Sequence, residues 1–107
     1  MEKDKALERL SKLSPEQLDD MRYEKMVELG KALKEQHKWK DNLLVSRRAK
    51  EQVLIQSGLK ESQIDRELRR DEELFKLKRL VMESTYLVKK IKLQITVITD
   101  IFWRVKP

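Results

Sequence analysis

Apolar residues in positions 74–105 recur at alternating steps of three and four, and this spacing constrains the fold more than any other feature. Ten positions follow this spacing, and Ser84 is the one polar residue among them. The other nine, here named the C-terminal seam, are Leu74, Leu77, Val81, Val88, Ile91, Ile95, Ile98, Phe102 and Val105. Such a spacing places them on one face of an α-helix. A period of two, typical of a β-strand, also fits residues 91–105, but it places Ile98 and Phe102 on the solvent-exposed face of that strand. The helical period explains more of the segment and predicts a helix.

Little in the rest of the chain interrupts helices. The 107 residues include only two Gly and two Pro, and 41% are charged, a composition typical of long helices and coiled coils. The large apolar residues of the last third argue against general disorder. The length suits a single small domain.

The start of the first long helix is marked by "LSPEQL", residues 13–18. Ser14 can cap a helix, Pro15 suits its first position, and Gln17 completes a capping box. Leu13 and Leu18 occupy the positions of a hydrophobic staple. We therefore predict a helix from about residue 15, after an N-terminal arm or short helix over residues 1–13.

One turn is predicted, at "SGLKES", residues 57–62. Gly58 can adopt the left-handed conformation that ends a helix, and Ser62 with Asp65 can cap the next one. The helices then cover about 15–56 and about 60–105, and a break at 41–42 fits as well as continuity. The predicted fold is all-α: a single helical domain over 14–107, built as a long antiparallel helical hairpin or coiled-coil-like bundle with a short N-terminal helix.

The first helix offers the C-terminal seam few apolar partners. In register with Met26, Leu29 and Leu33, its next seam positions are Gln36, Lys40, Leu43, Arg47 and Lys50. We therefore expect another copy or a helical partner protein to cover part of the seam. The leading prediction is a non-catalytic interaction protein with an assembly, adaptor or regulatory role, and a homo-oligomer in which a dimer is favoured.

The sequence contains few residues typical of a catalytic or metal-binding site. The chain has no cysteine and one histidine, His37, and with two glycines it lacks a phosphate-binding loop. We expect no enzyme activity, no cofactor and no metal site.

The N-terminus has no apolar core of signal-peptide length, and the longest stretch without Lys or Arg, residues 93–103, is too short to span a membrane. A soluble, cytoplasmic protein is expected.

The charge distribution suggests an alternative function. The net charge of +6 arises entirely after residue 46, which points to an acidic partner for the C-terminal part. Residues 53–71 resemble a helix-turn-helix, with Leu54, Gly58 and Ile64 at the motif's packing and turn positions. The resemblance implies a small DNA-binding regulator dimerised by its C-terminal helix, although acidic neighbours oppose phosphate binding. The candidate nucleic-acid contacts are Arg47, Arg48, Gln63, Arg66, Arg69 and Arg70.

A third, minor alternative comes from "HKWKDN", residues 37–42. A tryptophan near the middle of a two-helix chain resembles the hairpin proteins exported by type VII secretion, whose turn carries Trp-x-Gly. The chain departs from that family because Asp41 replaces the glycine, and because Tyr86 is followed four residues later by Lys90 instead of an acid. Trp39 as an ordinary core residue is the simpler interpretation.

Overall fold

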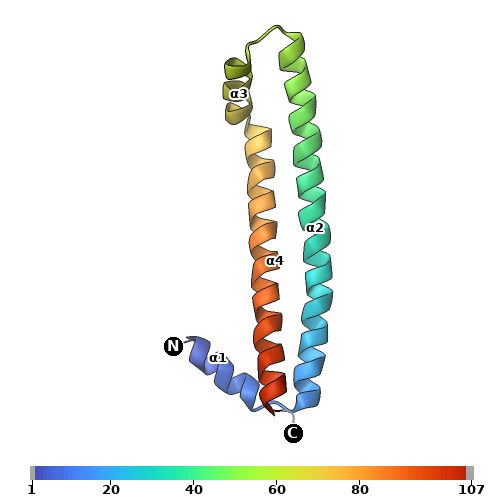
Figure 1. The fold of residues 1–107 in the computed structure, drawn as a ribbon, viewed down its shortest axis with the longest axis vertical. Coiled ribbons are helices and arrows are strands. Elements are labelled where there is room, and N and C mark those ends of the chain that lie inside the picture. Colours follow the sequence, from blue (N-terminus) through green and yellow to red (C-terminus); the bar gives the residue numbers. More distant parts are fainter. Residues whose placement is uncertain (1, 106–107) are drawn as a thin grey trace. The chain divides into compact units, whose positions relative to one another are not determined.

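The computed structural model describes the backbone of residues 2–105, with side chains from Lys5 onward except that of residue 6. Within this range it contains four α-helices and no strand: α1 (Glu2–Ser11), α2 (Pro15–Gln56), α3 (Glu61–Arg70) and α4 (Glu72–Val105) (Figure 1). The predicted fold class, an all-α helical hairpin with a short N-terminal helix, is confirmed. In residues 2–105 no helix has an apolar stretch long enough to cross a membrane.

The start of α2 confirms the capping box. The Gln17 amide donates to Ser14 Oγ at 3.2 Å, and the Ser14 amide donates to Gln17 Oε1 at 3.0 Å. Leu13 packs in the same cluster as Leu18, which is 0% exposed. Two otherwise unpaired backbone donors are thus satisfied while the staple holds the entering chain.

The end of α2 follows the predicted turn, and no break occurs at 41–42. Gly58 has a φ of 79°, in the left-handed region, and its amide donates to the Ile55 carbonyl at 3.0 Å. The Leu59 amide donates to the Leu54 carbonyl at 3.4 Å, and both leucines pack in one cluster. This is a Schellman motif, in which glycine avoids the strain that a β-carbon would bring at positive φ.

The helix predicted over about 60–105 is in fact two helices, so that prediction is wrong at Asp71. This residue is extended, with φ −70° and ψ 118°, and it separates α3 from α4. The Leu74 amide donates to Asp71 Oδ1 at 3.0 Å, so the carboxylate caps α4. The cap of α3 also differs from prediction, since the Lys60 amide donates to Gln63 Oε1 at 3.0 Å and Ser62 lies inside the helix.

The structure divides into two compact units. The first unit comprises the residues up to Ala32 and from Leu87 on, and therefore holds α1, the start of α2 and the end of α4. Leu18, Ile98 and Ile101 form its core. Six partly buried apolar residues pack around that core: Leu10, Leu13, Met21, Val97, Phe102 and Val105. Residues from both ends of the chain thus share one core.

The second unit, Leu33–Tyr86, contains α3 and the adjoining parts of α2 and α4. Its core consists of Ile64, Leu68 and Leu74, with Leu43, Leu54 and Leu59 packed against them. Two polar contacts define the helix register here: Lys50 with Asp71 and Gln36 with Thr85. Lys50 follows Gln36 by 14 residues, and its partner Asp71 precedes Thr85 by the same number. The two segments therefore run antiparallel, and 14 residues are two heptads of a coiled coil.

The C-terminal seam is buried or half-buried within one chain at all nine positions. Leu74 is 1% exposed, Ile98 is 3% exposed, and Val88 and Ile91 are 4% exposed. The expectation that this seam needs another chain to cover it is therefore wrong. Self-association itself stays a prediction.

The physical reason lies in the inner face of α2. Where the predicted register placed Lys40 and Arg47, both side chains are exposed, while Trp39 and Ser46 are partly buried. Gln36 is buried at 8% exposure, and its Nε2 donates to Thr85 Oγ1 at 2.9 Å. Long polar side chains can bury their aliphatic stems and satisfy their polar ends locally, so a polar seam position still covers apolar surface.

Candidate functional site

The described part of the chain holds no cluster of metal-ligating side chains. No group of three or more His, Asp or Glu residues there could hold a metal ion, and His37 is exposed on α2. The polar groups that do converge lie in the second unit, around the junction of α3 and α4.

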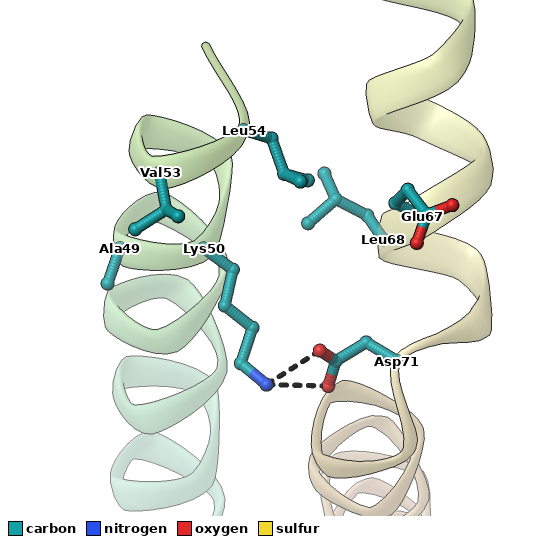
Figure 2. Close-up of a pocket in the computed structure, with 7 residues that line it drawn as sticks. All are labelled: Ala49, Lys50, Val53, Leu54, Glu67, Leu68 and Asp71. Carbon is teal, nitrogen blue, oxygen red and sulfur yellow. Dashed lines mark hydrogen bonds and ion pairs between the residues drawn. The ribbon is translucent and has the colours of Figure 1, made fainter. Parts of the chain in front are cut away.

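A cavity of about 340 Å³ adjoins this junction. Its lining comes from α2, α3 and the residue between α3 and α4 (Figure 2): Ala49, Lys50, Val53, Leu54, Glu67, Leu68 and Asp71. The walls are mainly apolar, and Lys50 and Asp71 close one side by pairing with each other. Each of these two charges therefore already has the other as its partner.

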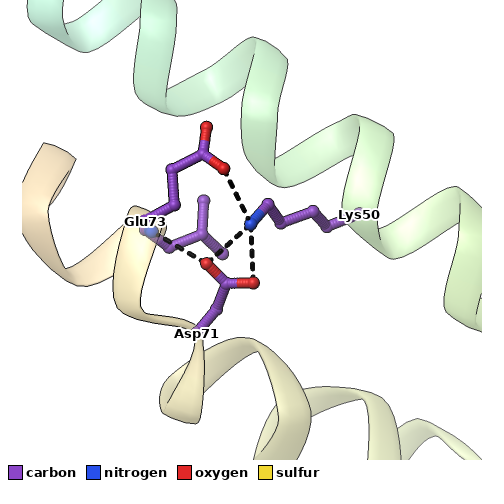
Figure 3. A network of polar contacts seen from close by, with 4 residues as sticks. Lys50, Asp71 and Glu73 are labelled. Carbon is purple, nitrogen blue, oxygen red and sulfur yellow. Dashed lines mark hydrogen bonds and ion pairs between the residues drawn. The ribbon is translucent and has the colours of Figure 1, made fainter.

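Lys50, Asp71 and Glu73 form a polar network beside that cavity (Figure 3). Lys50 Nζ donates to both carboxylate oxygens of Asp71 at 2.7 Å and lies 3.1 Å from Glu73 Oε2. The hydrogen bond from Lys50, followed by that from the Leu74 amide, lowers the pKa of Asp71 below its ordinary 3.8. The hydrogen bond to Asp71 raises the pKa of Lys50 above its ordinary 10.5. The network joins α2 to the start of α4, a structural role.

The pH dependence of this network gives a first testable prediction. The variant Asp71→Asn keeps a side chain that can cap α4 but removes the charge facing Lys50, so we expect a lower melting temperature at pH 7. Because the pKa of Asp71 is lowered in the folded state, its contribution is present above 3.8 and is lost as pH falls through the folded value. The raised pKa of Lys50 means that its contribution is lost only as pH rises above 10.5.

Thermal denaturation of both proteins between about pH 2 and pH 11 measures this effect. The difference in melting temperature should be largest across the neutral range and should disappear in strong acid. Lys50→Met provides a matched variant from the other side of the pair. A difference for Asp71→Asn that is the same at pH 2 and pH 7 would contradict the ionic role of Asp71.

All six candidate nucleic-acid contacts are exposed and lie in the second unit: Arg47, Arg48, Gln63, Arg66, Arg69 and Arg70. Among the described residues none of these arginines forms an ion pair. Gln63 is occupied, because its side chain accepts the Lys60 amide at the start of α3.

The resemblance to a helix-turn-helix is not supported by the packing of α3. Leu54 and Ile64 do share a core, as the motif requires. However, α3 runs back alongside α2, from the Schellman turn to the Lys50–Asp71 contact (Figure 1). The two helices of the motif cross steeply instead. Residues 53–71 are therefore the tip of an antiparallel hairpin.

One surface was missed in the sequence: an exposed apolar row on the outer face of α4. Phe75 is 66% exposed, Met82 is 72% exposed and Tyr86 is 70% exposed. Their spacing of seven and then four residues puts them on one side of α4, opposite the C-terminal seam. We name this row the α4 outer face. The spacing of these three residues could have revealed the row from the sequence. In the single helix predicted over 60–105, however, Phe75 lies on the same side as Ile64, a side expected to be buried.

A second apolar hollow, of about 420 Å³, lies in the first unit. It is lined by residues of α1, α2 and α4: Leu7, Leu10, Met21, Lys25, Leu93, Gln94, Val97 and Ile98. Only Lys25 and Gln94 contribute polar side chains, so the hollow has few groups that could orient a polar ligand.

Comparison of the chain with known protein families, curated proteins and solved structures finds no match. The resemblance to type VII-secreted hairpin proteins also fails on position. Trp39 lies inside α2, whereas the chain turns at residues 57–60.

Proposed function

We propose that this chain is a non-catalytic helical interaction protein, which self-associates or binds another helical protein through the α4 outer face. The observation that supports the proposal is the exposure of Phe75, Met82 and Tyr86 in one row. Fully burying a side chain of this size is worth about 1.5–3 kcal/mol, so three in a row are a sizeable contribution to binding.

The helical spacing of the row favours a helix as the partner. Steps of seven and four are those of coiled-coil contacts, in which side chains of one helix insert between those of the next. Scattered exposed apolar residues need no explanation, but a row aligned with a helix axis is a typical interaction surface. An assembly or adaptor role follows from such a surface without any catalytic group.

Light scattering across a dilution series tests the proposal. At tens of micromolar we expect the wild-type protein to exceed the monomer mass of 12.9 kDa, unless its partner is a different protein. The double variant Phe75→Glu with Met82→Glu should dissociate at concentrations about 10–100 times higher, because it places charges in the contact. Circular dichroism should stay helical, since both positions are exposed.

Val45→Glu is the matched control, because Val45 is 67% exposed on α2 and lies outside the α4 outer face. It should leave the mass unchanged. A wild-type protein that remains a folded monomer at high micromolar concentration would contradict self-association. The helical-partner version then requires affinity capture that Phe75→Glu with Met82→Glu abolishes and Val45→Glu does not.

A small DNA-binding regulator is the second candidate. It is favoured by Arg66, Arg69 and Arg70, which lie on the exposed side of α3 without ion pairs among the described residues. Asp65 lies beside them and opposes phosphate binding. Contacts from these arginines would be to the phosphate backbone and independent of base sequence.

A gel shift with duplex DNA distinguishes the two candidates. If the arginines bind phosphate, affinity should fall steeply between about 50 and 200 mM salt. Arg69→Ala with Arg70→Ala should weaken binding by about tenfold or more and reduce the salt dependence. Lys31→Ala with Lys34→Ala, on the exposed part of α2, is the control. No shift at the lowest salt would eliminate this candidate.

A further inference from the structure

The outer side of α2 near its start carries a second exposed apolar row. Tyr23 is 70% exposed, Met26 is 50% exposed and Val27 is 45% exposed, and all three belong to the first unit. We name this row the α2 outer face. Gly30 lies one turn further on, is exposed, and a β-carbon there would meet no atom within 4 Å. Glycine is less favourable than alanine inside a helix, and no contact among the described residues requires it at this position.

Unpaired acids flank the α2 outer face. Glu16, Asp20 and Glu24 are exposed at steps of four, which places them along one edge of the row. No ion pair among the described residues involves any of the three. Two further acids nearby are neutralised within α2: Asp19 pairs with Arg22 and Glu28 pairs with Lys25. Lys31, also exposed and without an ion pair among the described residues, lies further along the same edge, so the negative part is the N-terminal stretch from Glu16 to Glu24.

The α4 outer face has the opposite charge. Lys76 and Lys78 lie on either side of its row, are exposed, and form no ion pair among the described residues. Glu72, exposed one turn before Phe75, offsets one of these two charges, so the excess is positive but small. Arg79 pairs with Glu83 at 3.1 Å, so that pair adds no net charge. Two apolar rows of similar kind, one edged by carboxylates and one by ammonium groups, are complementary.

We propose that these two faces bind each other between copies: the α4 outer face of one copy packs against the α2 outer face of the next. This inference rests on the proposed function and names a second copy as the helical partner. Pairing of like faces is disfavoured, because it would bring lysines against lysines or carboxylates against carboxylates. The contact is heterologous, so each added copy presents one unused face of each kind, and assembly continues until a ring closes or a filament forms.

Complementation between two disabled variants tests this arrangement. The α4 variant is Phe75→Glu with Met82→Glu, and the α2 variant is Tyr23→Lys with Val27→Lys. Each alone should remain close to 12.9 kDa while the wild type grows with concentration beyond a dimer. Mixed in equal amounts, they retain one intact pair of faces, so the expected product is a dimer of about twice the monomer mass that grows no further.

Charge reversal at exposed positions gives a second measurement. Asp20→Lys with Glu24→Lys, and separately Lys76→Glu with Lys78→Glu, should each shift half-association to about tenfold higher concentration. Mixing these two proteins makes both kinds of contact complementary again, so association should return toward the wild-type level. Raising salt from about 50 mM to 500 mM should weaken wild-type assembly, because exposed charges are screened.

The results distinguish a failure of this inference from a failure of the proposed function. If the α4 variant is monomeric but the α2 variant associates like the wild type, the α2 face is not used and this inference is wrong, whereas the proposed function stands. Two monomeric variants whose mixture also stays monomeric would equally exclude pairing of these faces. If the wild type itself is a folded monomer at every concentration, both this inference and self-association are overturned. Val45→Lys, checked by circular dichroism, is the common control.

Discussion

Replacing Ile98 with Asp is expected to abolish cooperative folding of the first unit. Ile98 is 3% exposed and packs in one cluster with Leu18 and Ile101, which are 0% and 4% exposed. The cluster holds no cationic residue, and Lys25, which lines the hollow beside Ile98, is already paired with Glu28. Burying an unpaired carboxylate costs several kcal/mol beyond the lost apolar contact. Small domains are stable by only about 5–15 kcal/mol, so most of that margin would be lost.

Thermal unfolding followed by circular dichroism measures this effect, with hydrogen exchange to locate it. For Ile98→Asp we expect the helical signal to fall and protection of α1, the start of α2 and the end of α4 to disappear. Val45→Asp, the same kind of change at a 67% exposed position of α2, should alter the free energy of unfolding by less than about 1 kcal/mol. Retained protection around Ile98 in the variant would show that its burial within one chain is wrong.

Leu74→Ala is expected to lower the free energy of unfolding by about 2–5 kcal/mol. Leu74 is 1% exposed and packs with Ile64 and Leu68 in the core of the second unit. Truncation removes apolar contacts and leaves a void that the long helices cannot easily close. Because α3 has only 10 residues and depends on this core, its protection from hydrogen exchange should fall most.

The adjacent residue provides a demanding control. Phe75→Ala removes a larger side chain from the same turn of α4, but Phe75 is 66% exposed. We expect a change below about 1 kcal/mol in the free energy of unfolding, together with weaker self-association. Chemical denaturation of both variants at low protein concentration separates the two effects. A larger loss for Phe75→Ala than for Leu74→Ala would reverse the assigned burial of the helix.

Local features of the fold could be predicted from the sequence because they depend on residues close together in the chain. The Ser14–Gln17 capping box and the Gly58 turn each involve a few consecutive residues, and both occur as expected. The C-terminal seam was likewise readable, since helical spacing belongs to α4 alone. The sequence also carries a local signal for the break at Asp71. Arg69 and Arg70 end α3, while Glu72 and Glu73 begin α4, an arrangement that suits both helix dipoles.

The partner of each buried face could not be read from the sequence. A polar side chain such as that of Gln36 can hydrogen-bond to water as well as to protein. Nothing in the neighbouring sequence therefore shows that it is buried against Thr85. Lys50 is similar, because its inward position depends on Asp71, which is distant in the chain. Such contacts form only when two segments meet in one register, and many registers have similar local cost.

The sequence by itself therefore determined that the chain is all-α, where α2 begins and ends, and which face of α4 is its apolar seam. The tertiary structure decided what covers that seam and which side chains remain outside. The break at Asp71 is the clearest case: in an unbroken helix, Phe75 would follow Ile64 on the same side, but the reset at Asp71 buries Leu74 and leaves Phe75 exposed. The reason is physical: periodicity is a property of one helix, whereas burial is a property of two helices in register.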